Sequence, residues 1–124
     1  MALTQNLIVL DTNVVLYFLG GRLTNPLPSG QYFVSVITEI ELLSYPSLSS
    51  DEEVRSRDFL AKITVVELES SIKDLAITFR KQYRLRLPDA IIAATAQVLK
   101  ATLFTNDVRL ANLTEINTQS VQIL

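Results

Sequence analysis

Runs of apolar residues separated by polar turns predict the strands of this chain. Residues 7–10 (Leu-Ile-Val-Leu) form a continuous aliphatic run, which is typical of a strand buried on both faces of a parallel sheet. Similar runs predict further strands at residues 32–37, 63–66, 102–105 and 120–124. The first run stops at Asp11-Thr12-Asn13, where a turn or helix start is expected.

Apolar positions three or four residues apart predict the helices. This spacing predicts an amphipathic helix over residues 68–83, with the apolar face Leu68, Ile72, Leu75, Ala76, Phe79 and Tyr83. A helix over 14–19 is expected to be capped by Thr12 or Asn13 and to end at Gly20. Further helices are expected from Thr38 to before Pro46, over 51–61 behind a Ser49 or Ser50 cap, and as a turn over 107–113.

Pro88 begins another helix, at a position where its missing N–H costs nothing. Residues 89–99 are apolar nearly all round and rich in alanine, which predicts a central helix packed closely against the sheet. Strands that alternate with helices predict an α/β fold with a mostly parallel sheet. The sequence shows no repeat or linker, so we expect a single domain over residues 1–124.

Composition narrows the class of protein. With 48% hydrophobic and 19% charged residues, the chain should form a well-packed domain. No apolar run reaches the roughly 18 residues of a membrane span, and the start lacks the basic segment of a signal peptide. We therefore expect a cytoplasmic protein with no membrane partner. The absence of cysteine rules out disulfides and agrees with that location.

The chain has no histidine and no cysteine, which excludes several chemistries. A zinc site of nitrogen and sulfur ligands, a Ser-His-Asp triad and a thiol nucleophile all need one of them. The net charge of −2 argues against a plain RNA-binding module. It argues less against an enzyme whose carboxylates account for the acidity.

Four acids stand beside apolar segments, each at a strand exit or a helix start: Asp11, Glu41, Asp89 and Asp107. Sites of parallel α/β folds form at the carboxyl ends of the strands, so these acids can gather at one edge of the sheet. Gathered carboxylates need a cation, and an oxygen-only ligand set favours Mg²⁺ or Mn²⁺. Taken singly, each acid also has a structural interpretation as a turn residue, a helix cap or a solvated side chain.

Polar and basic neighbours of these acids are open to two interpretations. Thr12, Asn13, Thr105 and Asn106 can orient water and carboxylates, or simply cap helices. The only basic cluster contains Arg80, Lys81, Arg84 and Arg86. It could hold a phosphate backbone, although a solvated helix end is the simpler interpretation.

Four motifs together resemble the successive motifs of PIN-domain ribonucleases. They are Leu-Asp-Thr-Asn-Val at residues 10–14, Val-Ile-Thr-Glu-Ile-Glu-Leu-Leu at 36–43, Pro-Asp-Ala-Ile-Ile-Ala-Ala-Thr-Ala at 88–96 and Phe-Thr-Asn-Asp at 104–107. The closest likeness is to VapC-type toxins of bacterial toxin–antitoxin pairs. The resemblance runs from about residue 7 to residue 113, in the family's order and spacing.

The resemblance implies a three-layer α/β/α fold and a Mg²⁺- or Mn²⁺-dependent endoribonuclease, usually a homodimer silenced by a cognate antitoxin. Asp11, Glu41, Asp89 and Asp107 match the family's acidic site, with Asn13 and Thr105 in supporting roles. In the corresponding mechanism, Asp11, Asp89 and Asp107 hold the ion and Glu41 holds or deprotonates the attacking water. Some members carry a further acid where this chain has Arg109 or Leu110, which speaks against a full second metal site.

Other classes fit less well. A receiver-like phosphate-handling domain would need an adjacent acid pair and a late lysine, and a haloacid-dehalogenase-type phosphatase would need an aspartate at Asn13. A non-catalytic interaction domain with this fold stays open. Apolar residues of the early helices predict a homodimer and a groove for a basic antitoxin segment. The residues concerned are Leu16, Tyr17, Leu42, Leu43, Tyr45 and Leu48, and the alternative is that they line the chain's own core.

Overall fold

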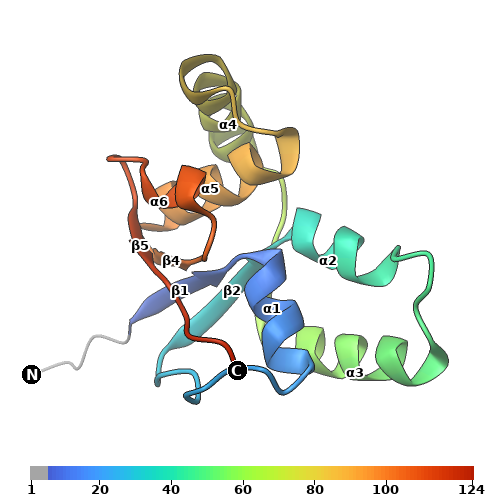
Figure 1. The fold of residues 1–124 in the computed structure, drawn as a ribbon. Coiled ribbons are helices and arrows are strands. Elements are labelled where there is room, and N and C mark those ends of the chain that lie inside the picture. The colour runs from blue at the N-terminus through green and yellow to red at the C-terminus, as the bar shows by residue number, and fades with distance from the viewer. Residues whose placement is uncertain (1–5) are drawn as a thin grey trace, which may run out of the picture.

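Five parallel strands form the central sheet of the computed structural model, which describes residues 6–124 (Figure 1). Their order across the sheet is β3-β2-β1-β4-β5. The strands are β1 (Leu7–Leu10), β2 (Gln31–Ser35), β3 (Thr64–Val66), β4 (Thr102–Phe104) and β5 (Asn117–Gln119). β1 lies between β2 and β4, and this central position explains why its aliphatic run is buried on both faces.

Helices cover both faces of the sheet, giving three layers. They are α1 (Thr12–Leu19), α2 (Val36–Leu43), α3 (Ser50–Ala61), α4 (Ser70–Tyr83), α5 (Leu87–Leu99) and α6 (Val108–Ala111). Side chains along β1 alternate between the layers: Val9 packs with α4 and α5, whereas Ile8 and Leu10 pack with α1 and α3. The predicted α/β/α architecture is confirmed, and the observed sheet is entirely parallel.

Helix α5 is the central buried helix that its alanine-rich sequence predicts. Every residue from Asp89 to Ala96 is buried, and the small side chains let α5 lie close to β1 and to α4. Pro88 occupies the first turn, as expected. Because α5 starts at the same sheet edge at which β1 ends, Asp89 is brought toward the strand exits.

Two predicted strand boundaries are wrong. The strand expected over 32–37 ends at Ser35, because the Ser35 hydroxyl accepts a hydrogen bond from the Ile37 N–H at 3.1 Å and caps α2. Helix α2 therefore begins at Val36, before the expected Thr38. The strand expected over 120–124 is also wrong. β5 is the polar segment 117–119, and the residues after it pair only through an antiparallel bridge between Leu23 and Ile123.

Helix starts are decided by individual side chains. Helix α1 starts at Thr12 with Asp11 as its N-cap, so the expected caps Thr12 and Asn13 are wrong. At α3 the prediction is confirmed: Ser49 caps the helix and exchanges hydrogen bonds with Glu52 in a capping box. Within residues 6–124, no helix combines the length and the apolar character that a membrane crossing needs.

Candidate active site

Asp11 leaves the sheet at the carboxyl end of β1, beside Thr105 at the end of β4. The register places Leu10 next to Phe104, and the Asp11 N–H donates to the Phe104 carbonyl at 3.0 Å. The Thr105 hydroxyl donates to Oδ2 of Asp11 at 2.6 Å. Both side chains are buried, with 6% of Asp11 and 1% of Thr105 exposed. Two distant sequence segments therefore meet at one edge of the sheet.

The electrostatic surroundings of Asp11 disfavour its charge. Burial raises the pKa of the Asp11 carboxyl, and the hydrogen bond from Thr105 offsets part of that effect. The negative charges of Asp89 and Asp107 raise the pKa further. Asp11 is therefore a buried carboxylate with two acidic neighbours, the arrangement that a bound cation would stabilise.

Asp107 is the N-cap of α6 and is joined to Asp11 through Thr105. Its Oδ1 accepts from the Arg109 N–H at 2.9 Å, and its own N–H donates to the Thr105 hydroxyl at 3.0 Å. Burial raises the pKa of Asp107, but the hydrogen bonds and the charge of Arg109 outweigh it, so the net shift is downward. Asp107 thus caps a helix, as its simpler interpretation predicts, and also faces the Asp11 site.

Asp89 enters the same network from the first turn of α5. It is 6% exposed, and its Oδ2 accepts from Nε of Arg86 at 3.1 Å. Nη2 of Arg109 lies 3.6 Å from this oxygen and 3.3 Å from Oδ2 of Asp107. The three aspartates therefore share a continuous set of hydrogen bonds and ion pairs.

Glu41 approaches this edge through Thr12. The Thr12 hydroxyl donates to Oε1 of Glu41 at 2.7 Å, and Thr12 Oγ1 lies 2.8 Å from Thr38 Oγ1. Glu41 is exposed on α2, one hydrogen bond away from the residue that follows Asp11. The bond therefore favours a role at this edge over that of a freely solvated side chain.

The two amide side chains differ. Asn13 is exposed in the first turn of α1, close in sequence to Asp11. Asn106 instead holds the chain's last segment, because its side chain donates to the Val121 carbonyl at 3.0 Å and accepts from the Val121 N–H at 2.8 Å. The helix-cap interpretation of Asn106 is wrong, because Asp107 is the N-cap of α6 and the contacts of Asn106 instead hold the last segment of the chain.

The donor chemistry at this edge fits a hard divalent cation, since every acidic ligand offers oxygen. In the arrangement described for residues 6–124, however, no group of three or more ligating side chains could hold a metal ion as it stands. Asp89 and Asp107 are instead paired with arginine. The metal-ligand roles of Asp11, Asp89 and Asp107 stay a prediction.

Sequence reasoning missed the two arginines of the site. It assigned Arg86 to a solvated basic cluster and treated Arg109 only as the place of a missing acid. The spacing contains a signal for both: Arg86 stands three residues before Asp89 in a helix start, and Arg109 two residues after Asp107. An arginine this close in sequence to each predicted ligand is a candidate ion-pair partner.

The family model of the PIN domain matches residues 8–116, which is most of the chain. The chain belongs to the PIN-domain family. The matched range contains Asp11, Glu41, Asp89 and Asp107, so the family predicted from the four motifs is confirmed. No curated protein sequence matches this PIN domain.

Solved structures similar to this PIN domain include toxin–antitoxin complexes. A chain of the toxin–antitoxin complex from Klebsiella pneumoniae is 28% identical with a TM-score of 0.74, covering 88% of this chain and 94% of that chain. A chain of VapBC-1 from nontypeable Haemophilus influenzae is 25% identical with a TM-score of 0.69, covering 92% and 97%. A chain of VapBC2 from Rickettsia felis, bound to a DNA fragment from its promoter, is 16% identical with a TM-score of 0.78, covering 94% and 99%. This last likeness shows the fold alone.

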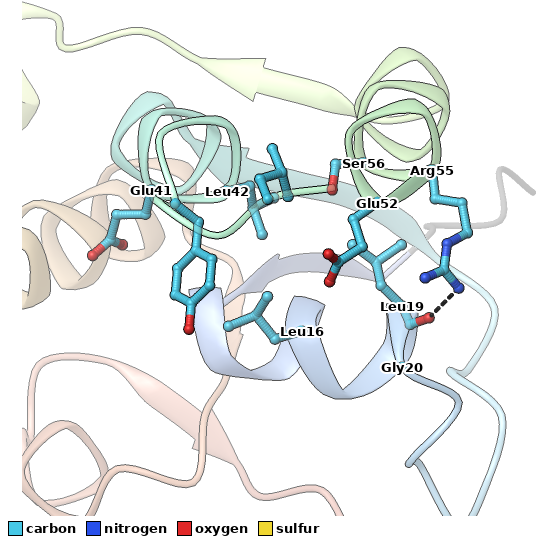
Figure 2. Close-up of a pocket in the computed structure, with 10 residues that line it drawn as sticks. Leu16, Leu19, Gly20, Glu41, Leu42, Glu52, Arg55 and Ser56 are labelled. Atoms are coloured by element: carbon cyan, nitrogen blue, oxygen red, sulfur yellow. Dashed lines mark hydrogen bonds between the residues drawn. The ribbon is translucent and has the colours of Figure 1, made fainter. Parts of the chain in front are cut away.

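The PIN domain also has an apolar groove of about 310 Å³ between α1, α2 and α3 (Figure 2). Leu16 and Leu19 of α1 form one wall, and Glu41 and Arg55 stand at opposite ends in this view. Leu16 is 49% exposed and Tyr45 is 63% exposed, as the prediction of a groove requires. Tyr17, Leu43 and Leu48 are partly exposed. Leu42 also lines the groove, but it is only 3% exposed and belongs to the core cluster that contains β1 and α1 residues, so its expected exposure is wrong.

Proposed function

We propose that this PIN domain is a Mg²⁺- or Mn²⁺-dependent endoribonuclease and the toxin of a type II toxin–antitoxin pair. The observation that carries the proposal is the network of Asp11, Asp89 and Asp107 at the carboxyl edge of a parallel sheet. The family match and the likeness to toxin–antitoxin complexes support it. Such a role belongs in the cytoplasm, where RNA is accessible.

Asp11, Asp89 and Asp107 are the residues that would hold the divalent cation. When bound, the cation supplies positive charge to the scissile phosphate and lowers the pKa of an attacking water. Thr105 keeps the Asp11 carboxylate oriented through its 2.6 Å hydrogen bond. This bond fixes one oxygen of Asp11 and directs the carboxylate toward the edge at which RNA would bind.

Glu41 is the proposed base, because the chain has no histidine to take a proton from water. The hydrogen bond from Thr12 holds one oxygen of Glu41 and leaves the other available to a water molecule. Asn13, exposed in the first turn of α1, is the proposed donor of an amide hydrogen bond to the substrate or to a water. The proton of the attacking water would thus go to Glu41 as the phosphodiester is cleaved.

The apolar groove is the proposed binding site of the antitoxin. Its lining combines Leu16, Leu19 and Tyr45 with the carboxylates of Glu41 and Glu52. An apolar segment with a basic side chain at its Glu41 end would match both features. Because Glu41 is also the proposed base, a partner seated there would silence the enzyme directly.

A non-catalytic interaction domain is the second candidate, and one observation favours it. Arg86 and Arg109 already neutralise Asp89 and Asp107, so these acids do not need a metal to be stable. A domain of this kind would keep its groove and its fold without cleaving RNA. It would also be insensitive to divalent ions.

Cleavage of a labelled RNA pool separates the two candidates. The intact protein should cleave with Mg²⁺ or Mn²⁺ and lose activity in EDTA. Asp11→Asn and Asp89→Asn should fold normally and lose about 100-fold or more of the rate, because each removes a charge at the reacting centre. Asp74→Asn is the matched control, since Asp74 is exposed on α4. Retained cleavage by the folded Asp11→Asn and Asp89→Asn variants would refute the assigned roles.

A further inference from the structure

Arg109 occupies a central place among the predicted metal ligands. A single nitrogen of its guanidinium, Nη2, lies 3.3 Å from Asp107 Oδ2 and 3.6 Å from Asp89 Oδ2. In addition, Nε of Arg109 lies 3.5 Å from Asp107 Oδ1. One positive group therefore bridges two carboxylates that come from different helix starts, which is what a cation at this site would do.

The contacts that hold the guanidinium are hydrogen bonds and ion pairs to these two carboxylates. The Arg109 side chain is 56% exposed, whereas the side chain of Asp89 is 9% exposed. Ion pairs with such exposed partners are weak, and a guanidinium released from them is readily solvated. Asp89 is buried and Asp107 partly buried, each held at a helix start, and the exposed arginine can leave them.

We propose that Arg109 is a positioning residue that serves as the protein's own counter-ion for this site, and that divalent metal binding displaces it from Asp89. This inference rests on the proposed metal-dependent function. Without metal, the guanidinium holds Asp89 and Asp107 together against their mutual repulsion. With metal, oxygens of Asp89 and Asp107 would become ligands, and repulsion between the ion and the nearby guanidinium would drive Arg109 off Asp89.

The arrangement of the ligands agrees with this account. As described for residues 6–124, the acids form no group that could hold a metal ion, and two of the three expected ligands, Asp89 and Asp107, have an oxygen that faces Arg109. Arg86 lies closer to Asp89, with its Nε 3.1 Å from the same Oδ2, but this contact stays within one helix start and does not link Asp89 to Asp107. Arg109 alone of these two joins the acids.

Two measurements with opposite expected signs test the proposal. Arg109→Gln should bind Mn²⁺ roughly fivefold more tightly in calorimetry, the size expected for losing two partly exposed ion pairs. In EDTA, the same variant should melt at a lower temperature than the wild type, because Asp89 and Asp107 then repel each other without compensation. If Arg109 had only a structural role, its substitution would lower the melting temperature without raising the affinity for Mn²⁺.

Two further variants serve as controls. Arg109→Lys keeps the charge and should bind Mn²⁺ with nearly wild-type affinity. Arg80→Gln removes an arginine that is exposed on α4, and it should change neither quantity. Equal or weaker Mn²⁺ affinity of Arg109→Gln would overturn the inference while leaving the metal site standing. No Mn²⁺ binding by the wild type or by any variant would overturn the metal-dependent function itself, and the inference with it.

Discussion

At the scale of single residues, Thr105 connects two of the predicted ligands. Its hydroxyl donates to Asp11 and accepts from the N–H of Asp107. Thr105→Val keeps the shape of the side chain but removes the hydroxyl. The Asp11 carboxylate and the Asp107 N–H then each lose a hydrogen-bond partner. We expect a loss of about 1–3 kcal/mol in the free energy of unfolding, measured by urea denaturation.

Thr95→Val is the matched control for this variant. Thr95 is equally buried, but its hydroxyl donates only to the Ile91 carbonyl one helical turn earlier in α5. Removing this hydroxyl leaves no buried charge without a partner, so the change in the free energy of unfolding should be close to zero. An equal loss of stability in the two variants would show that Thr105 does not support the carboxylate.

The acids of the candidate site could be singled out from the sequence, whereas the arginines had only the weaker signal of their spacing from Asp89 and Asp107. Asp11, Asp89 and Asp107 stand next to buried runs, where a carboxylate is unusual, so their positions alone draw attention. Arg86 and Arg109 are exposed, and arginine is common at exposed positions. Their spacing makes them candidates, and the distances between their nitrogens and the carboxylate oxygens distinguish them from solvated side chains.

At the scale of elements, the capping box of α3 gives a prediction that depends on pH. Hydrogen bonds from the N–H and hydroxyl of Ser49 lower the pKa of Glu52 below its ordinary value of 4.5. Ionised Glu52 therefore stabilises the fold above that ordinary value, and this stabilisation is lost as the pH falls through the lowered pKa. Glu52→Ala should reduce the melting temperature at about pH 7 and have little effect at about pH 3.

Asp51→Ala removes the same charge from the same helix turn and serves as the reference. The difference between the two variants isolates the contribution of the capping bond from that of the helix dipole. We expect this difference in melting temperature to be clear at neutral pH and to vanish in acid. A difference that persists unchanged in acid would contradict the assigned role of the Glu52 carboxylate.

Elements with strong periodicity were predictable, and those decided by one contact were not. The residues of α4 and α5 carry long regular patterns, and both helices lie where these patterns predict them. The end of β2 depends on a single hydrogen bond to Ser35, and β5 is a polar edge strand without an apolar run. No pattern in the sequence marks either feature.

At the scale of the whole molecule, apolar side chains are exposed on two separate surfaces. One is the groove between α1, α2 and α3, which we assign to an antitoxin. The other is the α4–α5 patch, formed by Leu68, Ile77 and Leu87, each about half exposed. The sequence places the homodimer contact on the early helices, but that surface contains the groove assigned to the antitoxin, so we now expect the α4–α5 patch to bind a second copy of the chain.

Light scattering tests both assignments. The protein alone should have about twice the 13.9 kDa mass of one chain. Ile77→Lys should give a monomer that still co-purifies with a co-expressed cognate antitoxin. Leu16→Lys should leave the dimer intact and lose that partner. A wild-type monomer at tens of micromolar would rule out a stable dimer. If the Leu16→Lys variant still binds the antitoxin, the groove is not the antitoxin site.

The central claim is that Asp11, Asp89 and Asp107 hold one divalent cation. Crystals grown with Mn²⁺ test it most directly, because manganese scatters anomalously and marks its own position. The account predicts one anomalous peak at roughly 2 Å from a carboxylate oxygen of each aspartate, with the guanidinium of Arg109 moved off Asp89. No peak at this edge of the sheet, with Arg109 still bridging Asp89 and Asp107, would contradict the claim.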